Sequence, residues 1–434
     1  MNRKGRVLAG AAAILLLAIA ASFIGRGSHV SAAGSRTLLF ALNVPVTADP
    51  YVAGVITRGA TLAVDKANAA GGVRIGGFTY KLKLKAYDDN NDPAQAAANV
   101  EKAISHGAVA VVEDGNGMAA SAAQSNAADV PQIAITDGTS GLLTTDAGPI
   151  TSLFGLRIPN DFAAEVLAIY IAGKTRSVAI LHDDTDNGRD GATQLQSSFE
   201  YSNITAKPVL EVAANAPTMD AEVLEIKSAN PGAVVIWGGD LFIARALTAI
   251  RDAGIDAPVY ASQQAESPAV RELDPPSVTD GLKFISGRMD SEFDNCSFPR
   301  FENALGKYRL APVDAHVKTA AGQEVRQPDD LDFFSYDAVN VVVAALEKAG
   351  SPQPGARLLQ DLAKVHVRSA NGDARGFSPQ AHEGFDLQDA YVAEIEDNQF
   401  EPVKDEPLSA SLATEPELMS GYPVPVPTTG CPSP

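Results

Sequence analysis

Cysteine and histidine are scarce in this chain of 434 residues, which contains two Cys and six His. Zinc sites use Cys and His at short, paired spacings, and the His residues, at positions 29, 106, 182, 316, 366 and 382, show no such pairing. A scaffold held together by many disulfides is excluded too, because Cys296 and Cys431 are the only cysteines. We therefore expect no metal site and no cofactor.

Signatures of several enzyme classes are also absent. The sequence contains neither a G-x-S-x-G nucleophile elbow nor a Walker-type phosphate loop. Aspartates are numerous, but an aspartate at the end of a strand is usually a turn former or a helix cap. We predict that the protein is not an enzyme.

Basic residues are outnumbered, since 34 Lys and Arg against 53 Asp and Glu give a formal net charge of −19. This charge repels nucleic-acid phosphates and anionic membrane surfaces, so we expect neither as a partner. A small anionic ligand is not excluded, because salt screens charges over about 8 Å at physiological ionic strength.

The N-terminal segment has the composition of an export signal. Arg3, Lys4 and Arg6 precede an uncharged run over residues 7–24, and the small residues at 30–33 suit signal peptidase. Residues 1–33 therefore predict export to the periplasm or another extracytoplasmic space. The apolar run is close to the length that spans a bilayer, so retention as an uncleaved anchor stays open.

The two cysteines allow one disulfide. In an oxidising compartment Cys296 and Cys431 could pair and tie the C-terminal tail to the body of the protein. Two free thiols are the alternative, and the sequence does not decide between them.

What the sequence does contain is a regular alternation of strand and helix patterns. A helix that ends at Gly71 is followed by a strand over residues 80–88 and by a helix that Asp92 caps and Pro93 starts. Further strands and helices alternate along the chain. The alternation predicts an α/β fold of doubly wound parallel sheets, and the chain is long enough for two lobes.

Two motifs carry a family resemblance. The pattern G-A-x-L-A-V…N-A-A-G-G-V, from Gly59 to Val73, and Y-D-D-N-N-D-P-x-x-A, from Tyr87, resemble the leucine/isoleucine/valine-binding type of extracytoplasmic solute-binding protein. The resemblance covers about residues 38–403. It implies the type I periplasmic-binding-protein fold, a Venus flytrap whose two lobes are joined by a three-crossover hinge. It also implies an amino-acid-like ligand and an ABC importer permease as partner, and we expect a monomer.

The resemblance divides the chain into lobes. The predicted divisions are an export signal at 1–33, lobe 1 at 36–157 plus 287–373, lobe 2 at 158–284 plus 376–404, a polar insert at 312–330 and a flexible tail at 405–434. The insert and the tail depart from the family pattern, and we expect both to be exposed and poorly ordered. The third crossing is expected at Arg375 to Phe377.

In open α/β sheets, ligands bind beyond the carboxyl ends of the strands. The ligand-binding candidates in lobe 1 are Tyr51, Asn116, Gly117, Met118, Asp137, Gly138 and Thr139. The three residues from Asn116 open a helix after a strand, so free backbone N–H groups can face a carboxylate. The resemblance implies that Thr139 faces the ligand's charged head group. Alternatively, the loop that contains Thr139 is an ordinary Gly-containing turn. The loop that contains Gly117 also resembles the fingerprint of a dinucleotide-binding site, which is the alternative reading there.

Lobe 2 supplies four further candidates: Asp161, Asn187, Asp240 and Gln263. Asp161 matches a family position that faces the cleft, or it is a plain helix cap. Asn187 lies in a turn over residues 183–188 that resembles a calcium loop, but the twelfth position, Gln194, cannot supply the bidentate carboxylate. Asp240 follows a Gly-Gly loop at the end of a strand.

Two of these positions depart from the family pattern. Asn187 replaces a common aromatic residue, and Gln263 stands where many amino-acid binders of the family carry an acid for the ligand's ammonium. Because a buried ammonium needs a carboxylate, either Asp161 or Asp240 takes over that role, or the ligand is not a typical branched-chain amino acid. The predicted function is capture of a small polar solute for an ABC importer; a ligand-sensing receptor domain of the same fold is the alternative.

Overall fold

The computed structural model describes residues 36–287, 297–308, 317–325, 327–370, 372 and 374–403. The predicted export signal, the predicted tail and both cysteines lie outside these residues, so what the sequence predicts for them stays a prediction. Among the helices of the described residues, none combines the length and the hydrophobicity that a membrane crossing requires.

The first sheet has six strands and is parallel except at one edge. Its order is β2 (Val73–Ile75), β3 (Phe78–Asp88), β1 (Arg36–Val44), β4 (Ala108–Glu113), β5 (Gln132–Ala134) and β8 (Leu153–Gly155). β2 is antiparallel to β3, and the other neighbours are parallel. The winding direction changes between β1 and β4, which is where ligands of doubly wound sheets bind.

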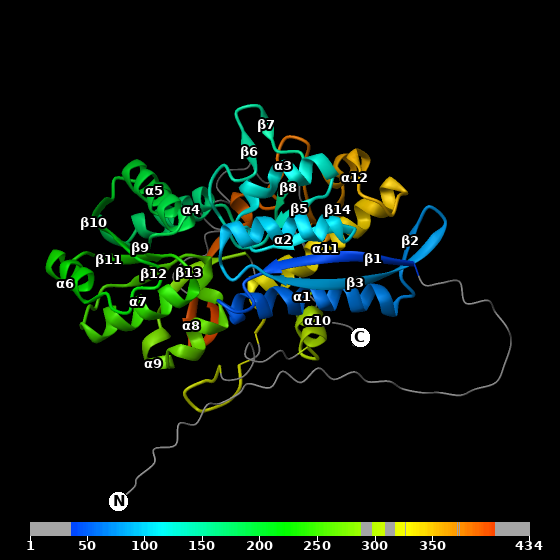
Figure 1. The fold of residues 1–434 in the computed structure, drawn as a ribbon. Coiled ribbons are helices and arrows are strands. Elements are labelled where there is room, and N and C mark those ends of the chain that lie inside the picture. The colour runs from blue at the N-terminus through cyan, green and yellow to red at the C-terminus, as the bar shows by residue number, and fades with distance from the viewer. Residues whose placement is uncertain are drawn as a thin grey trace, which may run out of the picture. The chain divides into compact units, whose positions relative to one another are not determined.

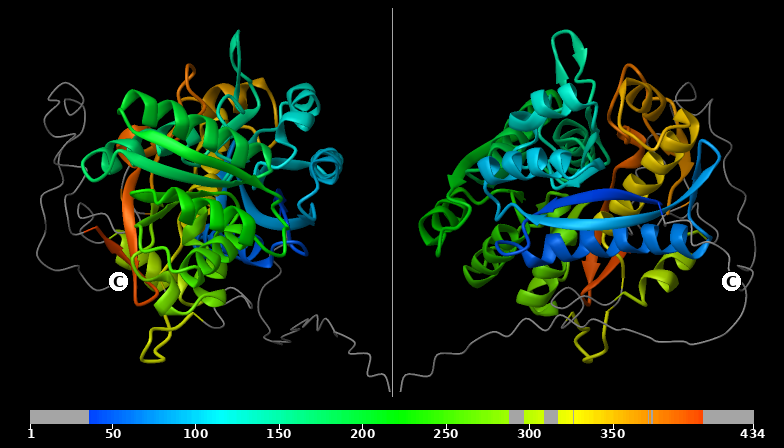
Figure 2. Two further views of the ribbon diagram at one scale, coloured as in Figure 1. Left: turned by 90° about the vertical axis from the view of Figure 1, so that its left-hand side faces the viewer. Right: turned by 45° about the vertical axis from the view of Figure 1, so that its right-hand side comes forward.

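The second sheet has seven strands and the same winding. Its order is β10 (Thr205–Val212), β9 (Ser177–Asp183), β11 (Ala233–Trp237), β12 (Val259–Ala261), β13 (Lys283–Ser286), β16 (Tyr391–Glu396) and β17 (Gln399–Pro402). The strands are parallel up to β13, which pairs antiparallel with β16. Figure 2 shows the orange-red β16 and β17 beside the green strands, although they come from the distant C-terminal part of the chain.

Helices cover both faces of each sheet. In Figure 1, α1 lies below β1 and β3, and α2 lies above them. The helices of the first lobe are α1 (Pro50–Ala69), α2 (Pro93–Ser105), α3 (Met118–Ala128), α10 (Ser297–Leu305), α11 (Asp330–Ala349) and α12 (Ala356–Leu362). Those of the second lobe are α4 (Asn160–Ala172), α5 (Asp186–Tyr201), α6 (Asp220–Ala229), α7 (Asp240–Asp252), α8 (Pro268–Leu273) and α9 (Pro276–Thr279), with the 3-10 turns η1 (Gln263–Glu266) and η2 (Leu387–Asp389). All residues of β4 and β11 are buried, as expected for strands covered on both faces.

The predicted class is therefore confirmed: two lobes, each built on a parallel-dominated, doubly wound sheet. The elements predicted around the two motifs are confirmed: the helix expected to end at Gly71 ends at Ala69, the strand expected over residues 80–88 is β3, and α2 begins at Pro93. Two short strand pairs complete the fold: β6 (Thr144–Thr145) with β7 (Gly148–Pro149), and β14 (His366–Arg368) with β15 (Ala374–Gly376).

The third crossing lies later than the sequence predicts. Arg375 and Gly376 belong to β15, which pairs with β14 rather than leading into the second sheet. Glu383 still bridges Gly155 at the end of β8. We therefore place this crossing after Glu383, and the exact division of the lobes remains our proposal.

The C-terminal end of the predicted insert differs from expectation. Residues 312–316 and 326 lie outside the described residues, but Asp329 and Asp330 are buried. Asp329 caps α11 in a capping box with Asp332, and Asp330 is the first residue of that helix. The expectation that residues up to 330 are exposed is therefore wrong at this end, because helix capping and lobe contacts bury both carboxyls.

Asp-Pro pairs start two helices of the first lobe. Asp92 accepts hydrogen bonds from the backbone N–H groups of Ala94 and Gln95, and Pro93 occupies the first turn of α2. Asp49 caps α1 in the same way, accepting from Tyr51 and from Val52, with Pro50 at its start. A side-chain cap satisfies N–H groups that have no partner within the helix, and proline tolerates the first turn because it has no N–H.

We expect Asp92→Ala to lower the free energy of unfolding by about 1 kcal/mol, because the N–H groups at the start of α2 lose their acceptor. Urea unfolding of the purified protein measures the change. Glu101→Ala, on the exposed face of the same helix, is the control and should unfold as the wild type does. Equal stability of Asp92→Ala and wild type would contradict the assigned cap.

Candidate functional site

The loops that follow β9 and β11 are joined by one buried side chain. Asp183, at the end of β9, accepts hydrogen bonds from the backbone N–H groups of Thr185 and Gly239, at 3.1 and 2.9 Å. Gly238 and Gly188 pack directly against this carboxylate: a Cβ at either position would approach its oxygens to 2.5 Å or less. Asp183 thus holds the two loops at the switch point of the second sheet.

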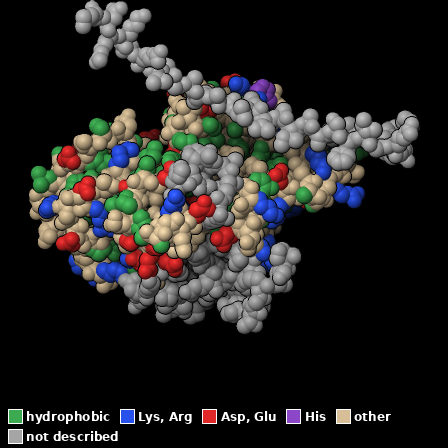
Figure 3. Space-filling model, turned by 90° about the horizontal axis from the view of Figure 1, so that it is seen from below, with side chains coloured by type: hydrophobic (Ala, Val, Ile, Leu, Met, Phe, Trp, Pro, Cys, Tyr) green, Lys and Arg blue, Asp and Glu red, His purple; other side chains and the backbone are tan. Residues whose placement is uncertain are grey.

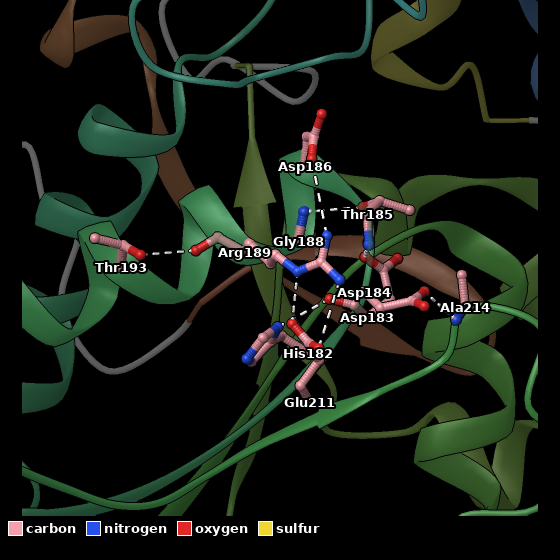
Figure 4. Close-up of polar contacts among 10 residues, drawn as sticks. All are labelled: His182, Asp183, Asp184, Thr185, Asp186, Gly188, Arg189, Thr193, Glu211 and Ala214. Atoms are coloured by element: carbon pink, nitrogen blue, oxygen red, sulfur yellow. Dashed lines mark hydrogen bonds and ion pairs between the residues drawn. The ribbon is translucent and has the colours of Figure 1, made fainter. Parts of the chain in front are cut away.

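Figure 4 shows that the other polar residues of this turn are engaged with the protein itself. Arg189 donates to Glu211 at 2.7 Å, and Asp184 accepts from the backbone N–H of Ala214 at 2.8 Å. No cluster of three or more metal-ligating side chains occurs among the described residues. The geometry therefore supports a structural turn here and gives no support to the calcium-loop alternative.

The matching edge of the first sheet is also rich in carboxyl groups. Asp114, at the end of β4, accepts from the backbone N–H of Asn116 at 3.0 Å. Asp137 follows β5 and accepts from the N–H of Thr139 at 2.9 Å and from its hydroxyl. Both loops are therefore shaped by their own aspartates, as in Asx turns.

Behind these loops lie carboxyl groups that are almost fully buried. Asp89 and Glu113 are inaccessible to solvent, and Asp114 is 5% exposed. Burial raises the pKa of Asp89 to about 6, and burial together with the neighbouring carboxylates raises the pKa values of Glu113 and Asp114 well above their usual range. These three carboxyl groups therefore keep their protons to a higher pH than ordinary carboxyl groups do.

Hydrogen bonds cross from the first lobe to α5. The backbone N–H of Ser140 donates to Asp190 at 2.9 Å. Asn160, the first residue of α4, donates through its backbone N–H to the carbonyl of Gly138 in the first lobe at 2.8 Å, and its side chain donates within the second lobe to Asn187 at 2.9 Å and to Asp190 at 3.0 Å. Gly138 is required beside it, because a Cβ there would lie 2.5 Å from the amide oxygen of Asn160. Two of the predicted site loops are thus brought together.

A second set of contacts joins the start of α1 to the second lobe. Asp49 and Asp240, which are 8% and 2% exposed, share a hydrogen bond across the lobes. Burial, and then the neighbouring Asp49, raise the pKa of Asp240 well above its usual range. The hydroxyl of Tyr51 donates a hydrogen bond to the carboxylate of Glu272 in α8. Burial, together with the charge of that carboxylate, raises the pKa of Tyr51.

A third contact lies between η1 and α11. Gln263 donates to Asp330 at 2.9 Å, and the N–H of Asp330 donates to Glu266 at 2.8 Å. Burial raises the pKa of Asp330 to about 8 and that of Glu266 well above its usual range. Gln263 therefore stabilises the junction between the lobes through Asp330.

The comparisons with known proteins now decide the family. A family model described as periplasmic binding protein matches residues 50–399. The chain belongs to the periplasmic binding protein family. The resemblance that the two sequence motifs carry is thereby confirmed.

Individual relatives agree with this assignment. A leucine-, isoleucine-, valine-, threonine- and alanine-binding protein of Pseudomonas aeruginosa is 26% identical over 329 residues, which are 73% of this chain and 80% of the relative. A type 1 periplasmic binding protein of Bordetella pertussis has a TM-score of 0.73 at 21% identity, over 85% of this chain and 100% of the other. LivJ of Streptococcus pneumoniae, solved with isoleucine, has a TM-score of 0.70 at 21% identity, over 85% and 99%. At these identities the structures show the shared fold.

Two predicted site residues of this periplasmic binding protein, Met118 and Asp161, have contrasting surroundings. The side chain of Met118 is fully buried among Ala134, Leu143 and Leu153, and its N–H donates to the carbonyl of Gly115. Asp161 lies in the first turn of α4 and is exposed. It does not cap the helix, because the N-cap position is occupied by Pro159. We therefore omit both from the proposed ligand contacts.

Sequence reasoning did not single out four residues that lie where the two lobes meet: Asp49, Asn160, Asp190 and Glu272. Asp49 carried a usable signal, because Asp49 with Pro50 repeats the cap pattern of Asp92 and Pro93. The other three carried no signal, since their contacts join segments that are far apart in the chain.

A surface cavity of about 560 Å³ lies elsewhere, between α8, α9 and the loop around Thr319. Its lining includes Arg271, Pro275 and Asn398 rather than the strand-end loops. The winding rule and the cross-lobe contacts are better guides to a ligand site than the size of this open depression, because they identify where both lobes meet.

Proposed function

We propose that this protein is the solute-binding component of an ABC importer, capturing a small polar ligand between its lobes and delivering it to a membrane permease. Its fold and its family support this role, as does the amino-acid-binding relative from Pseudomonas aeruginosa. The observation that carries the proposal is that polar groups at the carboxyl ends of both sheets converge, with Asp49 against Asp240 and Ser140 against Asp190.

The free energy that ligand binding requires argues for a site shared by both lobes. A helix N-terminus stabilises an anion at the surface by about 0.3–1 kcal/mol. Micromolar affinity needs about −8 kcal/mol, so donors and acceptors from both lobes must act together. Closure of the hinge brings them together and excludes water from the ligand.

The proposed contacts combine predicted and newly found residues. They are Tyr51, Asn116, Gly117, Asp137, Gly138, Thr139, Asn187 and Asp240 from the sequence, with Asp49, Ser140, Asn160 and Asp190 from the structure. Gln263 acts at the lobe junction, through Asp330. A ligand ammonium has Asp240, rather than Asp161, as its carboxylate partner, because Asp240 is buried at the junction and Asp161 is exposed.

The remaining features of the role belong to the same proposal. We propose an exported monomer that works outside the cytoplasmic membrane, with no reaction of its own and no nucleic-acid partner. The names of two structural neighbours, which contain the word transporter, favour the importer role over the receptor alternative. Whether residues 1–33 are cleaved is read directly from the mass of the mature protein.

A thermal-shift screen tests the proposal. A specific ligand raises the melting temperature by mass action, and ligand at about 100 times its dissociation constant stabilises by about 2.7 kcal/mol. We expect at least one compound from a panel of amino acids, amides, amines and aromatic acids to do so. If none does, and isothermal titration detects no binding either, solute capture is contradicted.

A further inference from the structure

The polar insert contains a segment that the proposed function leaves unexplained. Its described residues 317–325 and 327, which we call the strap, lie in sequence between α10 and α11, two helices of the first lobe. Lys318 bridges Glu324, so the strap turns back on itself as a short hairpin. Aromatic contacts join α10 to α11 directly, so the hairpin is not needed to hold these helices together.

One side chain of the strap pairs with the second lobe as a neighbouring strand would. The amide of Gln327 donates to the backbone carbonyl of Phe400 at 3.0 Å and accepts from its N–H at 2.6 Å. Phe400 belongs to β17, which is the edge strand of the second sheet. The backbone groups on the outer side of an edge strand have no further strand to pair with. Gln327 therefore satisfies both groups of Phe400 and ties the strap to the second sheet.

The hairpin contacts the second lobe at another point, the turn between β16 and β17. The N–H of Ala320 donates to the side chain of Asp397 at 2.5 Å, and the side-chain amide of Asn398 donates to the carbonyl of Lys318 at 3.0 Å. The strap is the yellow loop at the lower edge of Figure 1. Figure 3 views the molecule from below and shows both acidic and basic side chains on this side. The hydrogen bonds, rather than a contrast of charge, therefore identify where the strap docks.

The link from the docked Gln327 back to the first lobe is short and stiff. Only Pro328 separates Gln327 from Asp329, which caps α11. Proline fixes one backbone dihedral and restricts the residue before it, and two residues span at most about 7 Å. The helix α11 is itself held on α1, because Arg58 and Asp332 form a buried ion pair. A large movement of α11 away from β17 therefore has to break the hydrogen bonds of Gln327.

The contact between the strap and the second lobe is loosely packed. A cavity of about 560 Å³ lies between residues 318–320 of the strap and the helices α8 and α9. Residues 321–324 are exposed. Closely packed protein interiors contain few voids larger than a water molecule. The strap is therefore able to leave the second lobe without disrupting a hydrophobic core.

We propose that the strap holds the two lobes in the closed arrangement and that Gln327 has to leave Phe400 before the lobes open. The chain passes from α10 to the second lobe and back to α11, so the strap adds two connections to the crossings of the hinge. Opening of the cleft, and with it the exchange of any solute, is then limited by release of the strap. This inference goes beyond the proposed function, because the strap acts whether or not a solute is bound.

Hydrogen–deuterium exchange at Ser140 tests the proposal, because this N–H donates across the lobes to Asp190 at 2.9 Å and is released when they separate. The strand β6, which follows Ser140, lies at the top of Figures 1 and 2, whereas the strap lies at the bottom. A disturbance confined to the strap therefore does not reach this reporter. In the purified protein without added ligand, Gln327→Ala should speed exchange at Ser140 at least about tenfold, which corresponds to about 1.4 kcal/mol.

Two further variants accompany this one. Asp397→Gly removes the acceptor of Ala320 at the other docking point, and glycine readily adopts the φ of 52° found there. It should also speed exchange at Ser140. Gln323→Ala changes an exposed residue of the same hairpin and is the matched control, with exchange expected at the wild-type rate. Exchange in the buried strand β4 shows whether each variant keeps its global stability.

Faster exchange at Ser140, with β4 still protected, supports the strap as a restraint on lobe opening. Unchanged exchange at Ser140 in both Gln327→Ala and Asp397→Gly overturns it. A parallel loss of protection at Ser140 and in β4 also overturns it, because the strap would then support the folded chain as a whole rather than the closed arrangement. Neither result bears on solute capture, which the thermal-shift screen tests separately.

Discussion

Replacing Asp332 by alanine is expected to lower the free energy of unfolding by about 3–5 kcal/mol, the usual effect of removing one partner from a buried ion pair. Arg58 of α1 donates to the two oxygens of Asp332 at 2.7 and 2.6 Å. The side chains are 7% and 0% exposed. The remaining guanidinium charge would stay buried at the contact between α1 and α11 without this carboxylate.

The same helix pair explains why repacking cannot absorb the change. Gly59 lies so close to α11 that a Cβ would meet the carbonyl oxygen of Asp332 at 1.8 Å. The helices therefore have little freedom to shift and expose Arg58 to water. Denaturant unfolding monitored by circular dichroism measures the loss.

A control separates charge from helix capping. Asp332 also accepts from the N–H of Asp329 at 3.1 Å, and Asp332→Asn keeps an acceptor of the same size there while removing the charge. Asp332→Asn should therefore lose most of the stability that Asp332→Ala loses. A loss below about 1 kcal/mol in both variants, the range of an exposed pair, would show that the ion pair is not buried in solution.

The stability of the protein is expected to fall as the pH rises from about 4 to about 8. Burial raises the pKa of Asp329 to about 7 and that of Asp330 to about 8, from 3.8. An acid whose pKa is higher in the folded state binds more protons when folded, so its stabilisation is complete below the unfolded pKa and is lost as the pH passes the folded pKa. Each pKa unit corresponds to about 1.4 kcal/mol, so this cluster produces a large slope.

The surrounding charges determine the size of that slope. Asp330 contacts Glu266 and lies beside Asp329, while Arg58 and Arg271 lower the pKa of Asp329 only in part. We expect Asp330→Asn to flatten the profile and to raise the melting temperature at pH 8 relative to wild type, because it removes one buried acid.

Melting temperatures at pH 5, 6, 7 and 8 test the expectation. Val343→Ala, at a partly buried apolar position of the same helix, should lower stability at every pH and keep the wild-type slope. A wild-type melting temperature that stays constant or rises over this range would contradict the protonated cluster.

Much of the fold could be predicted because its signals are local. The neighbouring residues Asp92 and Pro93 are enough to mark the start of a helix, and α2 begins at Pro93. Strands such as the one over 177–183 stand out because apolar residues form a short run between turn formers. These patterns depend on neighbouring residues and survive any change of tertiary context.

The site could be predicted only in part. The loops after β4, β5 and β11 follow strand ends as the sequence predicts, and winding order makes them candidates for ligand binding. The surroundings of individual side chains could not be predicted: Met118 packs in an apolar cluster, and Asp161 is exposed in the first turn of α4 rather than capping it. A helical position near a strand end faces either the core or the cleft, and the sequence pattern does not distinguish the two.

The sequence by itself determined the α/β class, the two-lobed organisation, the acidic charge and the family, because periodicity, caps and motifs are local properties of the chain. The tertiary structure alone decided that Asp49 meets Asp240 and that Asp330 meets Glu266. Burial and mutual contact, which raise the pKa values of these carboxyls, arise only when loops from distant segments pack together.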